Sequence, residues 1–208
     1  MDDGVAVSIT AAGFASPLFK AGRVQLLPDR LGVAAALAEL LRADGLNVSL
    51  GEAIDAPAVI DLRALGLGDG AEQIDMALAA DTAAFELART LAPRMREGKG
   101  TLIFVQDTGG DLGLSGRSES RAWIGIAGLA KTAACEWPEA SVRVIDLEVG
   151  ARSPAQLAAE LYEELRAGGL EVEIGLTADG RRLTLEAIAE PLSANTQTIP
   201  EGSVFVVS

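Results

Sequence analysis

Short apolar runs alternate with amphipathic stretches along this chain of 208 residues. The apolar runs are rich in Val, Ile and Leu and lie between turn-forming residues, which is typical of buried strands. Strands alternating with helices predict an α/β fold with a doubly wound, mostly parallel, Rossmann-like sheet. The expected strands cover residues 5–10, 24–27, 48–50, 59–62, 101–105, 142–147, 170–176 and 182–187. The expected helices cover residues 31–44, 71–97, 118–136 and 153–166.

Proline and glycine mark several boundaries of these elements. Gly45 follows the first helix in the usual C′ position, and Ser153-Pro154 forms an N-cap with proline in the first turn. Pro93 lies inside the long second helix and is expected to kink or shorten it. Residues 178–181 read Ala-Asp-Gly-Arg and predict the turn of a terminal β-hairpin.

The composition and charge exclude several classes of function. Lys and Arg total 17 against 30 Asp and Glu, a formal charge of −13. An acidic surface repels phosphate backbones and anionic lipids, so neither nucleic acid nor a membrane is expected as a partner. No apolar run approaches the roughly 20 residues that span a bilayer. The start, Met1-Asp2-Asp3, has the wrong charge for a secretory signal, and we expect a cytoplasmic protein.

The chain has no histidine and one cysteine. The missing histidine removes the commonest general base, the Ser-His-Asp and Cys-His triads and most zinc sites, so no metal site is expected. Cys135 lies in an Ala-rich helix and is expected to be a small buried hydrophobe rather than a nucleophile. A single cysteine cannot form an internal disulfide, which favours a reducing compartment.

The turn after the strand at 24–27 is where a dinucleotide-binding domain needs several glycines. Residues 27–34 read LPDRLGVA, so Gly32 is the only glycine of this turn. Asp29 would meet the phosphates of a cofactor with the wrong sign of charge. We therefore expect no cofactor-binding residue here.

A second glycine-rich stretch, residues 109–116, follows the strand at 101–105. The next helix begins too late for its dipole to hold a phosphate there, so we expect a mobile surface loop without a catalytic role. Ser115 has neither the spacing of a nucleophile elbow nor a histidine to activate it. Asp107 and Asp111 are expected to be solvated rather than to share a cation.

Two features of the helix that follows have structural explanations. Gly125 and Gly128 lie three residues apart and are expected to let this helix pack closely on the sheet. Lys131 is the one lysine in an apolar stretch, and we expect it to snorkel to the surface.

Residues 126–148, IAGLAKTAACEWPEASVRVIDLE, resemble a segment from the ketoreductase regions of modular polyketide synthases and polyunsaturated-fatty-acid synthases. Residues 202–208, GSVFVVS, are similar to the opening strand of the reductase proper in those proteins. The resemblance implies a ketoreductase made of two halves of the short-chain dehydrogenase/reductase type. The first half is structural and truncated, and the second binds NADPH and reduces the β-ketoacyl group on the acyl carrier protein.

The resemblance also indicates which half this chain is. Active members use a Tyr-x-x-x-Lys pair. The only tyrosine, Tyr162, lies on a later helix and has Arg166 four residues on. The family's spacing, counted back from Glu136, places Glu119 and Trp123 where the pair belongs. The resemblance therefore implies that this chain is the structural half. It implies no catalytic, cofactor-binding or metal-binding residue in this chain, and NADPH only in the neighbouring half.

The expected organisation has three parts. Residues 1–20 are an upstream linker or leading strand, residues 21–190 the structural ketoreductase subdomain, and residues 191–208 a linker and the start of the catalytic subdomain. The chain is then a scaffold rather than an enzyme, and its partner is the catalytic half of the same parent chain. The apolar run at 204–207 is an unpaired strand that frays or allows self-association.

Two alternatives remain open. A stand-alone, divergent short-chain reductase would have to bind NADPH without the glycine turn. A pseudo-enzyme that binds an acyl group or a carrier protein would need an apolar pocket near residues 109–116. Acidic carrier proteins match an acidic surface poorly, which disfavours direct docking.

Overall fold

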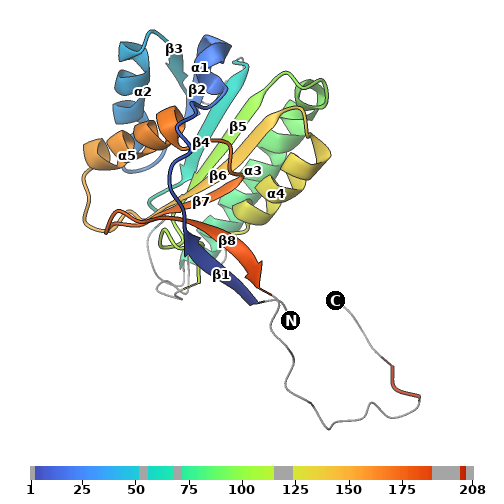
Figure 1. Ribbon diagram of the computed structural model, residues 1–208. Coiled ribbons are helices and arrows are strands. Elements are labelled where there is room, and N and C mark those ends of the chain that lie inside the picture. The colour runs from blue at the N-terminus through green and yellow to red at the C-terminus, as the bar shows by residue number, and fades with distance from the viewer. Residues whose placement is uncertain (1–2, 52–55, 68–71, 115–123, 189–201, 205–208) are drawn as a thin grey trace.

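The computed structural model describes residues 3–51, 56–67, 72–114, 124–188 and 202–204, and these form one sheet between two layers of helices (Figure 1). The strands are β1 (Asp3–Ser8), β2 (Arg23–Leu27), β3 (Asn47–Leu50), β4 (Ala58–Ala64), β5 (Thr101–Gln106), β6 (Ser141–Leu147), β7 (Glu173–Leu176) and β8 (Arg182–Ile188). The helices are α1 (Leu18–Ala21), α2 (Val33–Ala43), α3 (Glu72–Arg96), α4 (Ile126–Glu136) and α5 (Pro154–Ala167).

The strand order is β1-β8-β7-β6-β5-β4-β2-β3. All neighbours from β3 to β7 pair in parallel, whereas β8 is antiparallel to both β7 and β1. This confirms the predicted α/β class, the doubly wound parallel sheet and the terminal hairpin. The chain runs outward in opposite directions from β2 and β4, so the topological switch point lies between these two strands.

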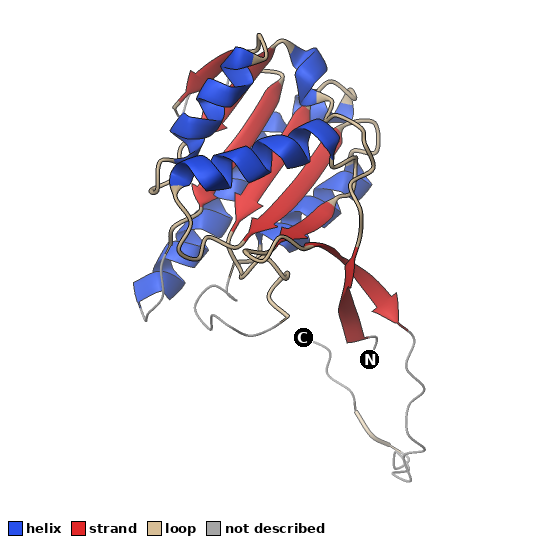
Figure 2. Ribbon diagram, turned by 60° about the vertical axis from the view of Figure 1, so that its left-hand side comes forward, coloured by secondary structure: helices blue, strands red, loops and turns tan. Residues whose placement is uncertain are grey.

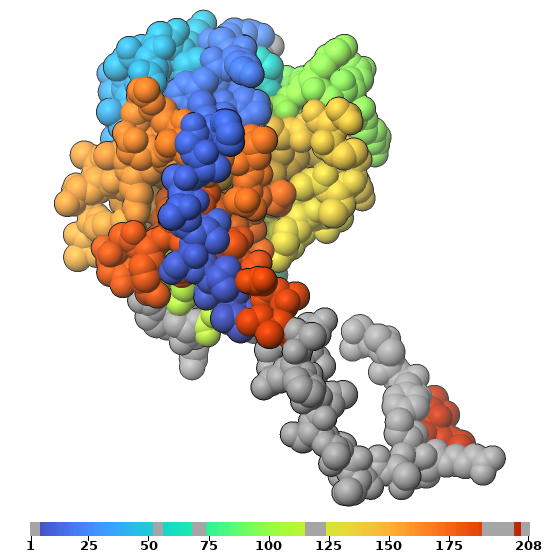
Figure 3. Space-filling model, viewed as in Figure 1, coloured from blue at the N-terminus to red at the C-terminus, as the bar shows by residue number. Residues whose placement is uncertain are grey.

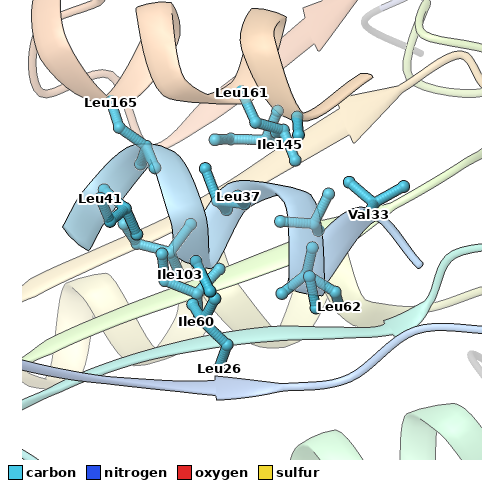
Figure 4. Close-up of a cluster of buried hydrophobic side chains, with 14 of the residues drawn as sticks. Leu26, Val33, Leu37, Leu41, Ile60, Leu62, Ile103, Ile145, Leu161 and Leu165 are labelled. Atoms are coloured by element: carbon cyan, nitrogen blue, oxygen red, sulfur yellow. The ribbon is translucent and has the colours of Figure 1, made fainter. Parts of the chain in front are cut away.

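Helices cover both faces of the parallel strands (Figures 1 and 2). Helices α2 and α5 pack on one face, and α3 and α4 pack on the other. Burial on both faces explains why the central strands read as continuous apolar runs instead of alternating with polar residues. Figure 4 shows the first cluster, where leucines of α2 and α5 meet the strand residues Leu26, Ile60, Ile103 and Ile145.

The helices differ from the predicted ones in three respects. Helix α3 continues as one element across Pro93 to Arg96, so Pro93 does not shorten it, although the helix lacks the one hydrogen bond that an N–H at this position would donate. Helix α4 begins at Ile126 instead of residue 118, and residues 115–123 lie outside the described parts of the chain. The short helix α1 was not predicted, because its four residues are too few to show a period. Most of the expected linker and final strand at 191–208 also lies outside the described residues.

Two expectations about α4 are wrong. Cys135 is exposed, because the helix buries its Ala130 face and Cys135 lies on another side. Gly128 is also exposed, and a Cβ atom there would meet nothing within 4 Å, so it allows no close packing. Gly125 is exposed at the N-cap of α4, where its N–H donates to the Asp81 carboxylate at 2.9 Å.

The N-terminal segment runs along the body of the domain. After β1 it passes next to α5, as Figure 3 shows for the blue chain beside the orange helix. The backbone N–H groups of Ala12, Gly13 and Ser16 donate to carbonyl groups at the end of α5, at 3.2, 2.8 and 2.8 Å. Among the described residues, no helix combines the length and apolarity that crossing a bilayer requires.

One buried carboxylate connects α5 with β6 and β8. Glu164 has a side chain that is only 3% exposed, and its Oε1 accepts from Arg143 at 2.5 Å. Arg182 donates from Nε to Oε2 of Glu164 at 2.7 Å. Arg182 also donates to the carbonyls of Thr10 and Gly168. The same network therefore fixes the terminal hairpin and the N-terminal segment to the parallel core.

We expect Glu164→Gln to lower the free energy of unfolding by about 3–5 kcal/mol, because it leaves Arg143 buried without its counter-charge. Urea denaturation followed by circular dichroism measures this loss. The matched control is Glu39→Gln, which breaks an exposed pair with Arg42 and is expected to cost at most about 1 kcal/mol. Equal losses in the two variants would contradict the role given to Glu164.

Candidate functional site

Ligands of open α/β sheets bind in the crevice beyond the carboxyl ends of the strands, at the switch point. In this chain, that edge is formed by the turns that follow β2, β4, β5 and β6. The residues of these turns are therefore the candidate site.

The turn between β2 and α2 is filled by the chain's own carboxylate. Oδ1 of Asp29 accepts hydrogen bonds from the N–H groups of Leu31, Gly32 and Val33 at 2.7, 2.7 and 3.1 Å. Oδ2 of Asp29 accepts from the N–H of Ala34 at 2.6 Å. Gly32 has a φ of +92°, a conformation that favours glycine. The acidic residue of this turn could be recognised in the sequence, but this geometry could not.

These hydrogen bonds use the donors that a phosphate would need. The first N–H groups of a helix have no partner within the helix, and together with the helix dipole they bind anions. In this chain, the four N–H groups around the start of α2 already donate to Asp29. The same carboxylate would repel a pyrophosphate placed beside it.

The first part of the loop after β5, residues 107–111, is buried, whereas the whole stretch 109–116 was predicted to lie on the surface; Leu114 is half-exposed. Asp107 and Asp111 are 4% and 8% exposed, so neither is the solvated carboxylate that was expected. A Cβ atom on Gly110 would lie 2.4 Å from the carbonyl oxygen of Leu176, and this close approach requires glycine. Ser115 lies outside the described residues.

Asp146, at the end of β6, holds this loop in place. Its side chain is fully buried, and its Oδ1 and Oδ2 accept from the N–H groups of Thr108 and Leu112 at 2.5 and 2.8 Å. Asp107 accepts from the N–H of Gly109 at 3.0 Å. Both carboxylates satisfy backbone donors of the loop, which is a structural role.

Burial raises the pKa of Asp146 from 3.8 to about 6. The hydrogen bonds from Thr108 and Leu112 oppose this rise, and the nearby charge of Asp107 adds to it. A carboxyl group with such a pKa is a candidate acid or base in an enzyme. Here, both oxygens are engaged by backbone N–H groups.

The remaining candidate side chains lie away from this edge or outside the described residues. Lys131 is half-exposed, as expected, and its Nζ also pairs with the buried Glu173 at 2.9 Å. Tyr162 donates from its hydroxyl to Asp44 at 2.6 Å and accepts from Arg166 at 3.0 Å, which links α5 to α2. Glu119 and Trp123 are outside the described residues. In the part of the chain that the structure describes, no three His, Cys, Asp or Glu side chains group as metal ligands.

A hollow of about 380 Å³ lies at the switch point, on the side of the sheet that α3 covers. Sequence reasoning missed it, because residues far apart in the chain meet only when β2 and β4 become neighbours. It is lined by Pro28, Arg30, Arg63, Leu67, Asp75, Met76, Ala79, Ala80 and Ala83.

No family model matches the chain, and no curated protein matches it. Among solved structures, it is similar to a multidomain structure with adenylation, ketoreductase and pseudo Asub parts, from a keto acid-selecting NRPS module. That match has a TM-score of 0.60 and 15% identity over 89% of this chain, but it spans only 18% of the other. The bulky-bulky ketone specific alcohol dehydrogenase from Comamonas testosteroni matches with a TM-score of 0.50 and 14% identity, over 75% of this chain and 78% of that one.

These neighbours define the class of fold. At such low identity, the likeness to these ketoreductase-containing and dehydrogenase structures shows the fold alone, which is Rossmann-like. The chain therefore has a Rossmann-like fold in which the N–H donors of the turn between β2 and α2 are occupied by Asp29.

The pKa of Asp146 predicts a pH dependence of stability. Folding raises this pKa, so the stabilisation is fully present below pH 3.8 and is lost as the pH rises through about 6. We compare the free energy of unfolding of the wild type with that of Asp146→Asn at each pH. The difference, wild type minus variant, should fall by about 2–2.5 kcal/mol between pH 4 and pH 7. Urea titrations across this range measure it, and a difference that rises with pH would contradict the raised pKa.

The hydrogen bonds that Asp29 accepts at the start of α2 predict that this side chain stabilises the helix. Asp29→Ala leaves the start of α2 without its acceptor and should lower the free energy of unfolding by about 1–2 kcal/mol. Asp29→Asn keeps one oxygen, which can accept from three of the four donors but leaves the N–H of Ala34 without its acceptor, so it should cost less than the alanine variant but remain measurable. Thermal denaturation of the three proteins checks both expectations. An alanine variant as stable as the wild type would show that the hydrogen bonds contribute nothing.

Proposed function

We propose that this chain is a non-catalytic scaffold that stabilises the NADPH-dependent β-ketoacyl reductase half of a multidomain polyketide or fatty-acid synthase. It packs against that catalytic half, covers apolar surface and holds the active site rigid. The chain itself performs no reduction and binds no NADPH.

The occupied cofactor turn carries this proposal. A reductase of this fold needs free N–H groups at the start of the helix after its first parallel strand, because they bind the pyrophosphate of the cofactor. In this chain, Asp29 accepts from all four of the N–H groups that it contacts there. A domain in which a side chain of the protein already occupies these N–H groups is suited to a structural role.

The strand order supports a truncated domain. The usual dinucleotide-binding sheet has two further strands beyond its first strand, on the side away from the switch point. Here only β3 lies beyond β2, and the chain passes from β3 to β4 through residues 51–57. A connection of that length is too short for another parallel strand with its crossover. One strand-and-helix unit of the complete fold is therefore absent between β3 and β4.

An apolar strip on α3 supports docking to a partner. Leu78 and Phe85 lie seven residues apart on this helix and are 51% and 56% exposed. Beside Phe85, a hollow of about 230 Å³ between α3 and α4 is lined in part by Leu129 and Trp137. Exposed apolar groups beside a hollow are typical of an interaction site. The occupant in this proposal is the catalytic ketoreductase half.

The comparison with solved structures is consistent with this setting. The NRPS module structure that matches 89% of the chain holds a ketoreductase within a multidomain protein. It supports a ketoreductase context and leaves the kind of synthase, its product and its stereochemistry as part of the proposal.

Co-expression tests the proposal. The catalytic half produced without this chain should be poorly soluble, and co-expression of the two as separate chains should restore solubility and ketoreduction. A Leu78→Asp, Phe85→Asp double variant should abolish the rescue, because it places two charges on the docking strip. Soluble yield and NADPH oxidation with a β-ketoacyl substrate are the measurements.

The matched control is Phe14→Asp, which adds a charge at another exposed phenylalanine, on the segment beside α5. It should rescue as well as the wild type. A catalytic half that is monomeric, stable and fully active alone would show that no scaffold is needed. The function would then have to be sought in binding.

A further inference from the structure

The hollow at the switch point places an arginine without a carboxylate partner beside an apolar wall. Arg30 is exposed on the turn after β2, and its Nη1 donates to Sδ of Met76 at 3.6 Å. A thioether is a weak, neutral acceptor and does not offset the charge of a guanidinium group. Within the described residues, no carboxylate forms an ion pair with Arg30.

The second arginine of the hollow is held rigidly. Arg63 donates from Nε and Nη2 to the two oxygens of Asp61 at 2.9 and 2.7 Å, and from Nη2 to the carbonyl of Ala83 at 3.3 Å. Asp61 is only 4% exposed, so this bidentate pair is fixed and largely neutral. Arg63 therefore shapes the hollow, while Arg30 supplies its free positive charge.

The opposite side of the hollow is apolar. One face of α3 presents Ala79, Ala80 and Ala83 to it, and Leu67 follows from the end of β4. The volume of about 380 Å³ lies within the range of small-molecule sites. A charged group on one side and small apolar side chains on the other fit a ligand with one charged end and a short hydrocarbon part.

We propose that this hollow binds a small organic monocarboxylate, with the carboxylate on Arg30 and a short alkyl chain along the alanines of α3. The guanidinium group forms paired hydrogen bonds with a carboxylate. Asp75 also lines the hollow, so a ligand with two or more negative charges is disfavoured there. The site goes beyond the scaffold role and is independent of it.

The hollow shares Pro28 and Arg30 with the turn that a dinucleotide would use, but it does not include the free N–H groups that a pyrophosphate needs. The N–H groups at the start of α2 are occupied by Asp29, so the hollow offers no backbone cradle for a pyrophosphate. A nucleotide is therefore the competing ligand that the experiment has to exclude.

Titration with hexanoate, followed by NMR of alanine methyl groups, tests the proposal on the whole chain. Hexanoate should shift the methyl signals of Ala79, Ala80 and Ala83 in a saturable way, with a Kd on the order of 1 mM, as expected for a ligand of few atoms. 1-Hexanol, which keeps the chain but lacks the charge, should bind at least about tenfold more weakly. AMP and inorganic phosphate should leave these signals unchanged.

Two variants and one control distinguish the contribution of the Arg30 charge from that of the alanine side chains of α3. Arg30→Gln should weaken hexanoate binding about tenfold, the effect of losing one charged hydrogen-bonding partner. Ala79→Phe should weaken it by filling the hollow without a change of charge. Arg89→Gln removes the same charge from a highly exposed arginine of α3 that pairs with Glu86, and it should bind hexanoate like the wild type.

Three results would overturn the proposal. The first is the absence of saturable shifts at tens of millimolar hexanoate, roughly tenfold above the expected Kd. The second is tighter binding of AMP at the same methyl groups, which would identify a nucleotide site. The third is an equal loss in the Arg30→Gln and Arg89→Gln variants, which would show only general attraction to positive charge.

Discussion

The backbone N–H groups at the carboxyl edge of this sheet need acceptors, and for several of them carboxylates of the chain supply these. Asp29 accepts from the start of α2, Asp146 accepts from the loop after β5, and Asp81 accepts from Gly125 at the start of α4. Buried donors must be satisfied, and helix starts favour anions, so these carboxylates fix the turns. The contacts of Asp29 use the N–H groups with which a dinucleotide-binding domain of this fold would hold a pyrophosphate.

Much of the fold could be predicted from the sequence, because its strands are buried on both faces and its helices show clear periods. The apolar run at β5 and the Ser153-Pro154 start of α5 are local signals, and both elements occur where they were expected. The loop after β5 was predicted wrongly. The burial of this loop depends on Asp146, which accepts a hydrogen bond from Thr108, 38 residues earlier in the sequence. A local sequence pattern cannot indicate a contact between residues so far apart.

The candidate site could be predicted only in part. The single glycine and the acidic residue of the cofactor turn were visible, whereas the four hydrogen bonds of Asp29 depend on how the turn folds. Cys135 was assigned to the core because its neighbours are apolar, yet the direction of α4 leaves it exposed. The hollow with Arg30 and Arg63 arises only when β2 and β4 pair.

We propose that Asp29 occupies the N–H groups that would otherwise bind a cofactor, and that NADPH binds only to the partner of this domain. Isothermal titration of NADPH into the purified chain tests this proposal most directly. We predict no binding heat at physiological NADPH concentrations, because the N–H groups of the turn already donate to Asp29. A saturable isotherm with a Kd in the micromolar range would contradict the account and support a divergent reductase that holds its cofactor in another way.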